Sequence, residues 1–181
     1  MLQSKKILVP NDFSVKPLIL LKKIMESNPE ENYHIILLHG IYPPDGISDL
    51  LFYSKTRVIK EMENEEFVKS CNLFKSKFRS RITAMYAEVI TYTRKDALNS
   101  FLEISGIDEI YLPGGLEFSF KGENTFNIIP LLKQASVPVK YVAFENQNEE
   151  EAKTSSEFSS LFISELTKSF ITTYDGRTAI S

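Results

Sequence analysis

The sequence predicts an α/β protein, a doubly wound sandwich built on a five-stranded parallel sheet. Short apolar runs of strand length alternate with longer segments whose apolar residues recur at helical spacing. Each apolar run ends at proline, glycine or polar residues, as at Val9-Pro10-Asn11. Strands that alternate with helices form a parallel sheet, because each right-handed crossover packs its helix back onto that sheet.

Length and composition favour one domain with a short appendage. The 181 residues are 43% hydrophobic and 25% charged, close to globular averages. A single cysteine, Cys71, excludes an intramolecular disulfide and a cysteine-based zinc site. The apolar runs fall far short of the roughly 20 residues that span a bilayer, and the first residues lead into a strand rather than a signal segment. We therefore expect a cytoplasmic protein without a membrane partner.

The first strand is expected at residues 6–9, where it stops at a polar turn. Ser14 is a plausible N-cap for the helix that follows, with Pro17 in its first turn and its end at Asn28-Pro29. The continuous apolar run 33–38 then predicts a second strand, covered on both faces.

The middle of the chain combines chain breakers with an unusually apolar segment. Pro43-Pro44 and Asp45-Gly46 stop regular structure, and Leu50 to Tyr53 follow, which suggests a lid or a contact surface. From Val58 the apolar stripe of one long helix extends to about Arg81.

The second half repeats the strand and helix alternation. Residues 87–92 predict the third strand, and Thr93 to Asp96 form a capping-box pattern that opens a helix closed by Gly106. Residues 108–113 predict the fourth strand, which ends in Gly114-Gly115. A last helix is expected over 125–135, and the fifth strand over 138–144.

We place the domain boundary at residue 144. Residues 1–144 form the α/β domain, and residues 145–181 are interpreted as an acidic linker followed by an amphipathic helix. The apolar face of that helix, between Phe158 and Phe170, either docks on its own domain or contacts a protein partner. The nearly neutral remainder lacks the clustered basic face that nucleic-acid binding requires, so no nucleic-acid partner is expected.

Four blocks of the sequence resemble the universal stress proteins. They are residues 6–14, 36–40, 108–114 and 137–139, and the resemblance covers residues 5–144. It implies a doubly wound domain, like that of the adenine nucleotide alpha hydrolases, and a homodimer formed through the last strand. The residues that this implies for the dimer interface are Val137, Val139, Tyr141 and Ala143.

The resemblance also implies a possible nucleotide site, because one subgroup of the family binds ATP. Its adenosine side would correspond to Pro10, Asn11, Asp12 and Gly40 here, and we add His39, Pro113, Gly114, Gly115 and Thr125 as candidate ligand-binding residues around the same crevice. The family's phosphate loop follows the pattern Gly-x2-Gly-x9-Gly-Ser/Thr. Only Gly114 matches, and Glu117 stands at the second glycine. Counting nine further residues places Asn127-Ile128 at the Gly-Ser/Thr pair, whereas aligning back from Pro138 places Thr125-Phe126 there.

A phosphate cradle works because glycines let backbone N–H groups approach the oxygens. Glu117 brings a negative charge to that loop. We therefore expect no cofactor, and no binding of ATP or another adenine nucleotide in the family's usual way.

Several single residues allow two interpretations. Asp12 either binds a ligand, as an acceptor for an adenine amine or ribose hydroxyl or as a metal carboxylate, or caps the first turn beside Ser14. His39 is either a ligand-binding or basic group, or a partly buried hydrogen-bonding residue. Cys71 lies on an apolar helical stripe and is interpreted as a packed, inert thiol. The spacing of histidines and carboxylates suggests neither a catalytic group nor a metal site.

Taken together, these features predict a non-catalytic stress-response or signalling protein that acts through dimerisation and partner contacts. One alternative is a protein that binds a small ligand or nucleotide in the crevice at the ends of strands one and four, with Leu50 to Tyr53 as a lid. A second alternative is a nucleotide hydrolase of related fold, for which the fold is the only support.

Overall fold

The computed structural model describes residues 4–122, 124–144 and 156. These residues form, in chain order, β1 (Ser4–Pro10), α1 (Lys16–Ser27), β2 (Asn32–Ile41), α2 (Ile47–Leu51), α3 (Lys55–Met62), α4 (Glu65–Lys77), β3 (Ile82–Ile90), α5 (Lys95–Ile104), β4 (Glu109–Gly114), β5 (Thr125–Phe126), α6 (Ile129–Leu132) and β6 (Val139–Ala143). The sheet has the order β3-β2-β1-β4-β6, with β5 added beside β2.

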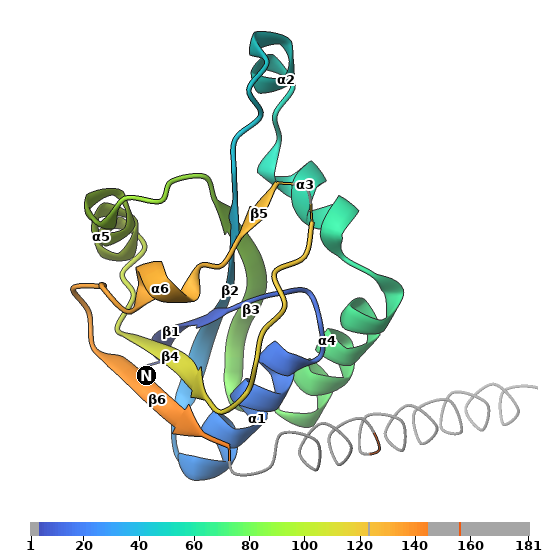
Figure 1. Cartoon of the computed structure of the whole chain (residues 1–181). Helices are drawn as coiled ribbons and strands as arrows, with labels where there is room; N and C mark the ends of the chain where they lie inside the picture. The colour runs from blue at the N-terminus through green and yellow to red at the C-terminus, as the bar shows by residue number, and fades with distance from the viewer. Residues whose placement is uncertain (1–3, 123, 145–155, 157–181) are drawn as a thin grey trace, which may run out of the picture.

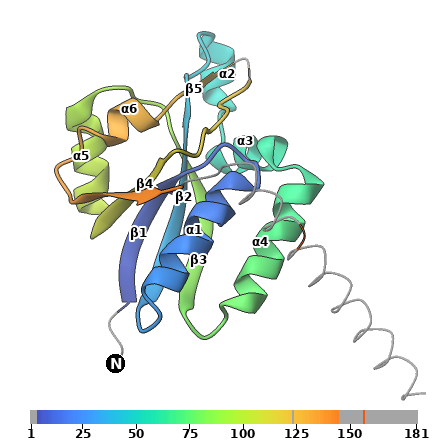
Figure 2. The same cartoon turned by 60° about the horizontal axis from the view of Figure 1, so that its bottom comes forward.

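Helices cover both faces of the sheet, as Figures 1 and 2 show. On one face α1 and α4 bury a core that includes Leu18, Leu21 and Phe74. On the other face α5 and α6 pack over a second core that includes Leu98 and Leu132. The predicted α/β doubly wound fold is therefore confirmed, and its β1, β2, β3, β4 and β6 pair in parallel.

The long helix predicted between Val58 and Arg81 is wrong, because the structure divides it. The chain forms α3, breaks at Glu63 and Asn64, and resumes as α4. The Asn64 side chain accepts a hydrogen bond from the backbone N–H of Phe67 at 2.8 Å, and this N-cap starts the second helix. After α4 the chain turns directly into β3, which begins earlier than residue 87.

The helix predicted over 125–135 is also shorter than expected. Only Ile129–Leu132 are helical, and Thr125 and Phe126 form β5, which pairs antiparallel with Gly40 and Ile41 of β2. The sheet therefore contains one short antiparallel strand in addition to the five parallel ones.

Two predicted helix starts differ in detail. The N-cap of α1 is Val15 rather than Ser14, although the Ser14 Oγ accepts a bond from the Lys16 N–H at 3.1 Å. The N-cap of α5 is Arg94 and makes no side-chain capping bond, so the predicted capping box at Thr93 is not formed. Gly106 does follow α5 with a φ of 61°, as its predicted role in closing the helix requires.

The predicted acidic linker and the Phe158–Phe170 helix lie outside the described residues. A search of the described part of the chain found no helix that is both long and apolar enough to cross a membrane.

The strand β6 forms one edge of the sheet and is held to β4 by a charged cluster. Lys140 on β6 contacts the Glu109 carboxylate at 2.7 Å, and the Tyr111 hydroxyl donates to the same carboxylate at 2.8 Å. Burial by itself raises the pKa of Glu109, but these two hydrogen bonds and the charge of Lys5 outweigh it, and the pKa is lowered.

We expect Glu109→Gln to lower the free energy of unfolding at pH 7 by about 1–3 kcal/mol, because a charged hydrogen bond is lost. A lowered pKa in the folded state stabilises the protein above the unfolded pKa, and this stabilisation is lost as the pH falls through the folded pKa. The difference between wild type and variant, measured by urea unfolding, should therefore shrink below about pH 4. Glu103→Gln, at an exposed position of α5, is the control. A difference that does not change with pH would contradict the assignment.

Candidate functional site

The candidate site begins where β1 and β2 end side by side. The backbone N–H of Asn11 donates to the Leu38 carbonyl at 2.8 Å, which extends the strand pairing by one residue. Asn11 itself is fully buried, and its Oδ1 accepts a bond from the Phe13 N–H at 2.9 Å. The polar residue that follows the strand thus fixes the turn that leads into α1.

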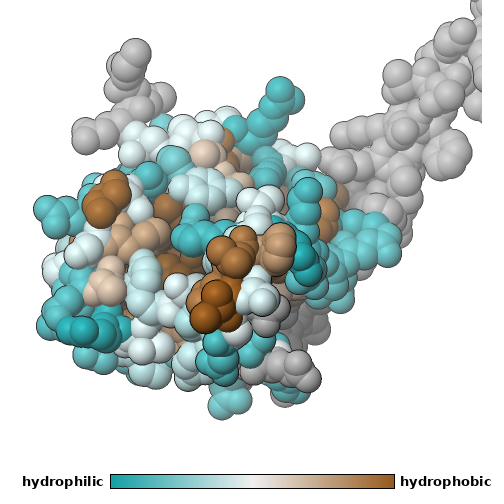
Figure 3. All heavy atoms as spheres, turned by 90° about the horizontal axis from the view of Figure 1, so that it is seen from above, coloured by the Kyte–Doolittle hydropathy of each residue, from teal (hydrophilic) through white to brown (hydrophobic). Residues whose placement is uncertain are grey.

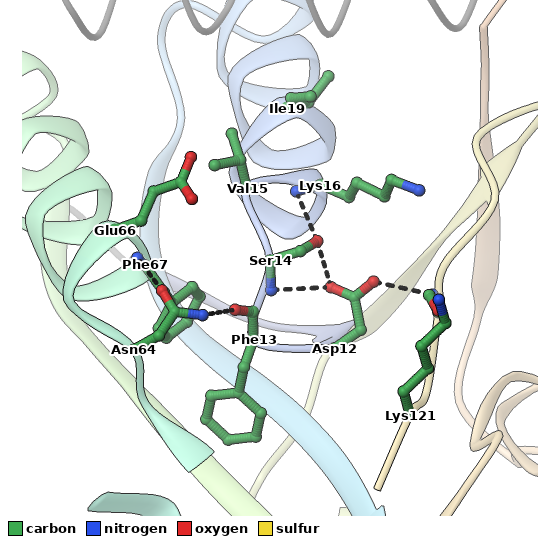
Figure 4. Close-up of a pocket in the computed structure, with 11 residues that line it drawn as sticks. Asp12, Phe13, Ser14, Val15, Lys16, Ile19, Asn64, Glu66, Phe67 and Lys121 are labelled. Atoms are coloured by element: carbon green, nitrogen blue, oxygen red, sulfur yellow. Dashed lines mark hydrogen bonds between the residues drawn. The ribbon is translucent and has the colours of Figure 1, made fainter.

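Phe13 has an unusual backbone conformation, with a φ of 55°, which is unfavourable for a bulky side chain. Its carbonyl accepts a bond from the Asn64 amide at 3.2 Å, so this side chain caps α4 and also holds the turn after β1 (Figure 4). The Phe13 ring is buried between the rings of His39 and Phe67, at centroid distances of 5.1 and 5.4 Å. Packing of this ring offsets the backbone strain.

Asp12 accepts hydrogen bonds at both carboxylate oxygens. Oδ1 accepts from the N–H and the hydroxyl of Ser14, at 3.1 and 2.6 Å. Oδ2 accepts from the backbone N–H of Ser119 at 2.9 Å, across the crevice. Asp12 therefore caps its own turn, one of the two predicted interpretations, and in addition ties the segment after β4 to the end of β1.

His39 lies at the centre of the crevice and is 1% exposed. Its Nδ1 is 2.6 Å from the Asn11 carbonyl, so this nitrogen must carry the proton, which leaves Nε2 as an acceptor in the neutral ring. Burial lowers the pKa of His39, although the bond to Asn11 and the charge of Asp12 act in the opposite direction. Among the described residues, neither His39 Nε2 nor Asn11 Nδ2 has a hydrogen-bond partner.

Gly40 lies directly under the ring of Phe126. A Cβ atom at Gly40 would be 2.6 Å from the Phe126 ring, far inside van der Waals contact. The two residues are also register partners in the antiparallel pairing of β5 with β2. Because Gly40 has no side chain, an aromatic ring of the same chain can pack directly against it.

Residues 115–122 and 124–126 cross the ends of the strands, and we call them the cover segment. Leu116 is buried, and the Phe120 ring lies 5.8 Å from His39. The Lys16 amine donates to the Glu117 carbonyl at 2.6 Å and holds the segment against the start of α1. The cover segment therefore occupies the crevice with its own aromatic rings.

The glycines after β4 serve the sheet rather than the crevice. Gly114 pairs with Ala143, and its carbonyl accepts a bond from the Phe144 N–H at 2.7 Å. Gly115 has a φ of 92°, and a Cβ there would be 2.5 Å from the Phe144 carbonyl oxygen. Gly115 thus allows a close approach to the end of β6, whereas a Cβ at Gly114 would make only an ordinary contact, at 3.4 Å.

The predicted site residues therefore occupy different places in the fold. Asn11, Asp12, His39 and Gly40 come together at the ends of β1 and β2, next to Pro10 at the end of β1. Thr125 lies on β5, where it pairs with Ile41, and its hydroxyl donates to the Phe120 carbonyl at 3.1 Å. Pro113, Gly114 and Gly115 lie at the end of β4, where Pro113 and Gly114 are paired with β6.

Sequence reasoning missed the residues that fill the crevice. Phe120, Phe126 and Ser119 belong to the cover segment, and Asn64 comes from the break that was predicted as continuous helix. One signal was present in the sequence, since Phe118, Phe120 and Phe126 are unexpected in a loop that faces solvent.

A cavity of about 460 Å³ remains on the α1 and α4 side of the cover segment. It is lined by the turn after β1, by α4 and by the cover segment, including Asp12, Ser14, Asn64, Glu66 and Lys121 (Figure 4). Its volume lies in the range of small-molecule sites. Acidic and basic side chains both line it, so its charge is mixed.

Other candidate groups lie apart from the crevice. Burial raises the pKa of the Cys71 thiol to about 12, in agreement with a packed, inert residue. Over residues 4–122 and 124–144, no three histidine, cysteine or carboxylate residues are grouped so that they could hold a metal ion.

We expect Gly40→Ala to reduce the free energy of unfolding by about 1–3 kcal/mol, because the new methyl group overlaps the Phe126 ring. The cost should be smaller in a Phe126→Ala background, where the ring is absent, and the double-mutant cycle measures this coupling. Gly114→Ala, whose Cβ would be 3.4 Å from the nearest atom, is the control. Equal costs of Gly40→Ala in both backgrounds would show that the ring does not lie on Gly40.

Comparison with known proteins gives matches among solved structures alone. No family model matches the chain, and no curated protein does. A hypothetical protein of known structure is 20% identical to this chain. The match covers 78% of this chain and 97% of that protein, with a TM-score of 0.48. A universal stress protein family member from Burkholderia pseudomallei is 14% identical to this chain. That match covers 76% of this chain and 95% of the Burkholderia protein, with a TM-score of 0.44.

A universal stress protein family protein from Arabidopsis thaliana, solved with AMP bound, is 17% identical. The match covers 80% of this chain and 94% of that protein, with a TM-score of 0.40. The chain is thus similar to solved structures of universal stress proteins, the family that its four sequence blocks resemble.

Proposed function

We propose that this chain is a universal-stress-protein-like, non-catalytic protein that acts through dimerisation and partner contacts, with its nucleotide crevice closed by its own cover segment. The observation that carries the proposal is the position of the Phe126 ring on Gly40. The sequence resemblance assigns the adenosine side of the site to this edge of β2. A side chain that fills this position competes directly with a nucleotide base.

The state of the polar groups in the crevice supports a non-catalytic function. A general base must reach the proton that it removes. His39 is buried between two aromatic rings, with its Nδ1 bonded to a backbone carbonyl. Asp12 already accepts three hydrogen bonds from Ser14 and Ser119. Neither group is presented to a substrate while the cover segment stays in place.

The outer edge of β6 supports dimerisation. The Phe144 N–H points toward β4, so the N–H groups of Tyr141 and Ala143 point to the outer side by strand alternation. Tyr141 is 60% exposed, and no described strand pairs with β6 on that side. An exposed strand edge of this kind invites pairing with a second copy.

Calorimetric titration tests the closed crevice. We expect no micromolar binding of ATP, ADP or AMP to the full chain; AMP is included because the Arabidopsis protein holds it. The Phe120→Ala/Phe126→Ala variant opens the crevice and should gain measurable affinity if the aromatic rings are the obstacle. Micromolar binding by the wild type that Asp12→Ala weakens would contradict the proposal.

A Tyr141→Pro variant tests the dimer edge, because proline removes the outward N–H at that position. Sedimentation should show that its mass falls two-fold relative to the wild type, whereas Tyr141→Thr, which keeps the N–H, retains the wild-type mass. Equal masses for the two variants and the wild type would contradict pairing through β6.

A second candidate function rests on the cavity of about 460 Å³ beside Asp12. It would hold a small polar ligand without opening the cover segment, with Ser14, Asn64 and Lys121 on its walls. The same titrations distinguish it, since binding at this cavity should be weakened by Lys121→Ala and unaffected by Phe126→Ala.

A further inference from the structure

The most unusual surface of this protein is a projecting arm formed by residues 42–53. The chain leaves the end of β2, rises away from the body, forms the short helix α2 and returns to α3 (Figure 1). Three apolar side chains on the arm are largely exposed: Ile47 at 81%, Leu51 at 77% and Phe52 at 77%. We call these three residues the arm tip.

Seen from above, hydrophobic side chains gather at the end of the arm (Figure 3). Tyr42 and Leu50 are also exposed, at 50% and 51%, so the apolar surface continues along the arm. Contiguous apolar patches of this kind on a folded domain mark interaction surfaces rather than ordinary solvent-facing residues.

A cavity of about 720 Å³ lies at the base of the same arm. Its walls come from the start and end of the arm, from α3, and from the last residues before β5; they include Tyr42, Tyr53, Val58, Met62 and Asn124. The Tyr53 hydroxyl is buried and has no hydrogen-bond partner among the described residues. The base of the arm therefore offers apolar walls at Val58 and Met62, a charged pair of Arg57 with Glu61, and the Tyr53 hydroxyl, which an occupant could satisfy.

Charge is distributed differently along the arm and its base. Residues 43–53 contain two aspartates and no lysine or arginine, whereas α3 contains Lys55, Arg57 and Lys60 with Glu61 as its only acid. Lys55 already pairs with Glu88 and Arg57 with Glu61, both at 2.7 Å, so the acidic, apolar segment finds its complementary charge on α3 mainly at Lys60.

We propose that two copies of this chain exchange arms, so that the arm tip of each copy fills the cavity at the base of the other. Two arms that pack side by side in opposite directions bring each tip to the other's base. This arrangement has two-fold symmetry, and the same surface serves on both partners. It buries the arm tips of both copies and places each acidic segment against a basic α3.

The arm points away from the body that carries its own cavity, so its tip does not reach that cavity in this structure (Figure 1). A second copy is therefore the occupant that fits the observed geometry. The arm also lies apart from the β6 edge (Figure 1), so this interface is additional to the proposed pairing through β6.

Sedimentation of the full chain at high micromolar concentration tests the exchange. The Leu51→Ser/Phe52→Ser variant should lower the mass of the largest species, to that of the monomer where the arm is the sole contact and to that of the β6-paired dimer where β6 also pairs. Ile104→Ser is the matched control, because Ile104 is an apolar residue on α5 that is 87% exposed and lies outside the arm. The proposal would be overturned by an arm variant whose mass equals that of the wild type. That result is also the one expected if the arm binds another protein or a lipid surface instead of a second copy.

Disulfide trapping tests the direction of packing. In a Cys71→Ala background, a mixture of Phe52→Cys protein with Val58→Cys protein should give a disulfide-linked pair that contains one chain of each kind. The Tyr141→Pro change in both chains should leave this pair intact, which separates the arm from the β6 edge. Failure to trap the mixed pair, or formation of a disulfide within one chain of the Phe52→Cys/Val58→Cys double variant, would overturn the exchange.

Discussion

The pairing of β5 with β2 determines what the crevice can hold. Two residues of β5 lie against Gly40 and Ile41, and this short contact places the Phe126 ring on a glycine that has no side chain to resist it. From there the cover segment runs back across the strand ends, where Asp12 holds Ser119 and Lys16 holds Glu117. If this pairing opened, His39 and the end of β1 would be exposed to solvent.

The same region concentrates the unfavourable features of the molecule. Phe13 has a positive φ, and buried polar atoms of Asn11 and His39 lack partners among the described residues. Strained backbone and unpaired polar groups each cost free energy, and they persist where the surrounding structure fixes them. Here the two cores on either side of the sheet supply that rigidity, because the strands beneath the crevice are buried on both faces.

The sequence predicted the architecture well, because apolar runs that end at turn residues depend on local patterns. Residues 33–38 are a continuous apolar run, and they form a strand buried on both faces. The predictions were wrong where a single side chain, or a contact with a residue distant in the sequence, determines the local secondary structure. Asn64 starts α4 through a single capping bond, and Thr125 and Phe126 become a strand through contact with β2. Neither contact has a periodic signal.

By itself, the sequence determined that the chain folds as an alternating α/β sandwich, and that Asn11, Asp12, His39 and Gly40 meet at the ends of neighbouring strands, since parallel strands present their carboxyl ends at one edge. It also showed that the segment after β4 keeps only Gly114 of the glycines in the family's phosphate-loop pattern. Only the tertiary structure decided what replaces them. The cover segment folds into the crevice because Gly40 leaves room for Phe126 and Asp12 offers an acceptor to Ser119, two contacts between residues far apart in the chain.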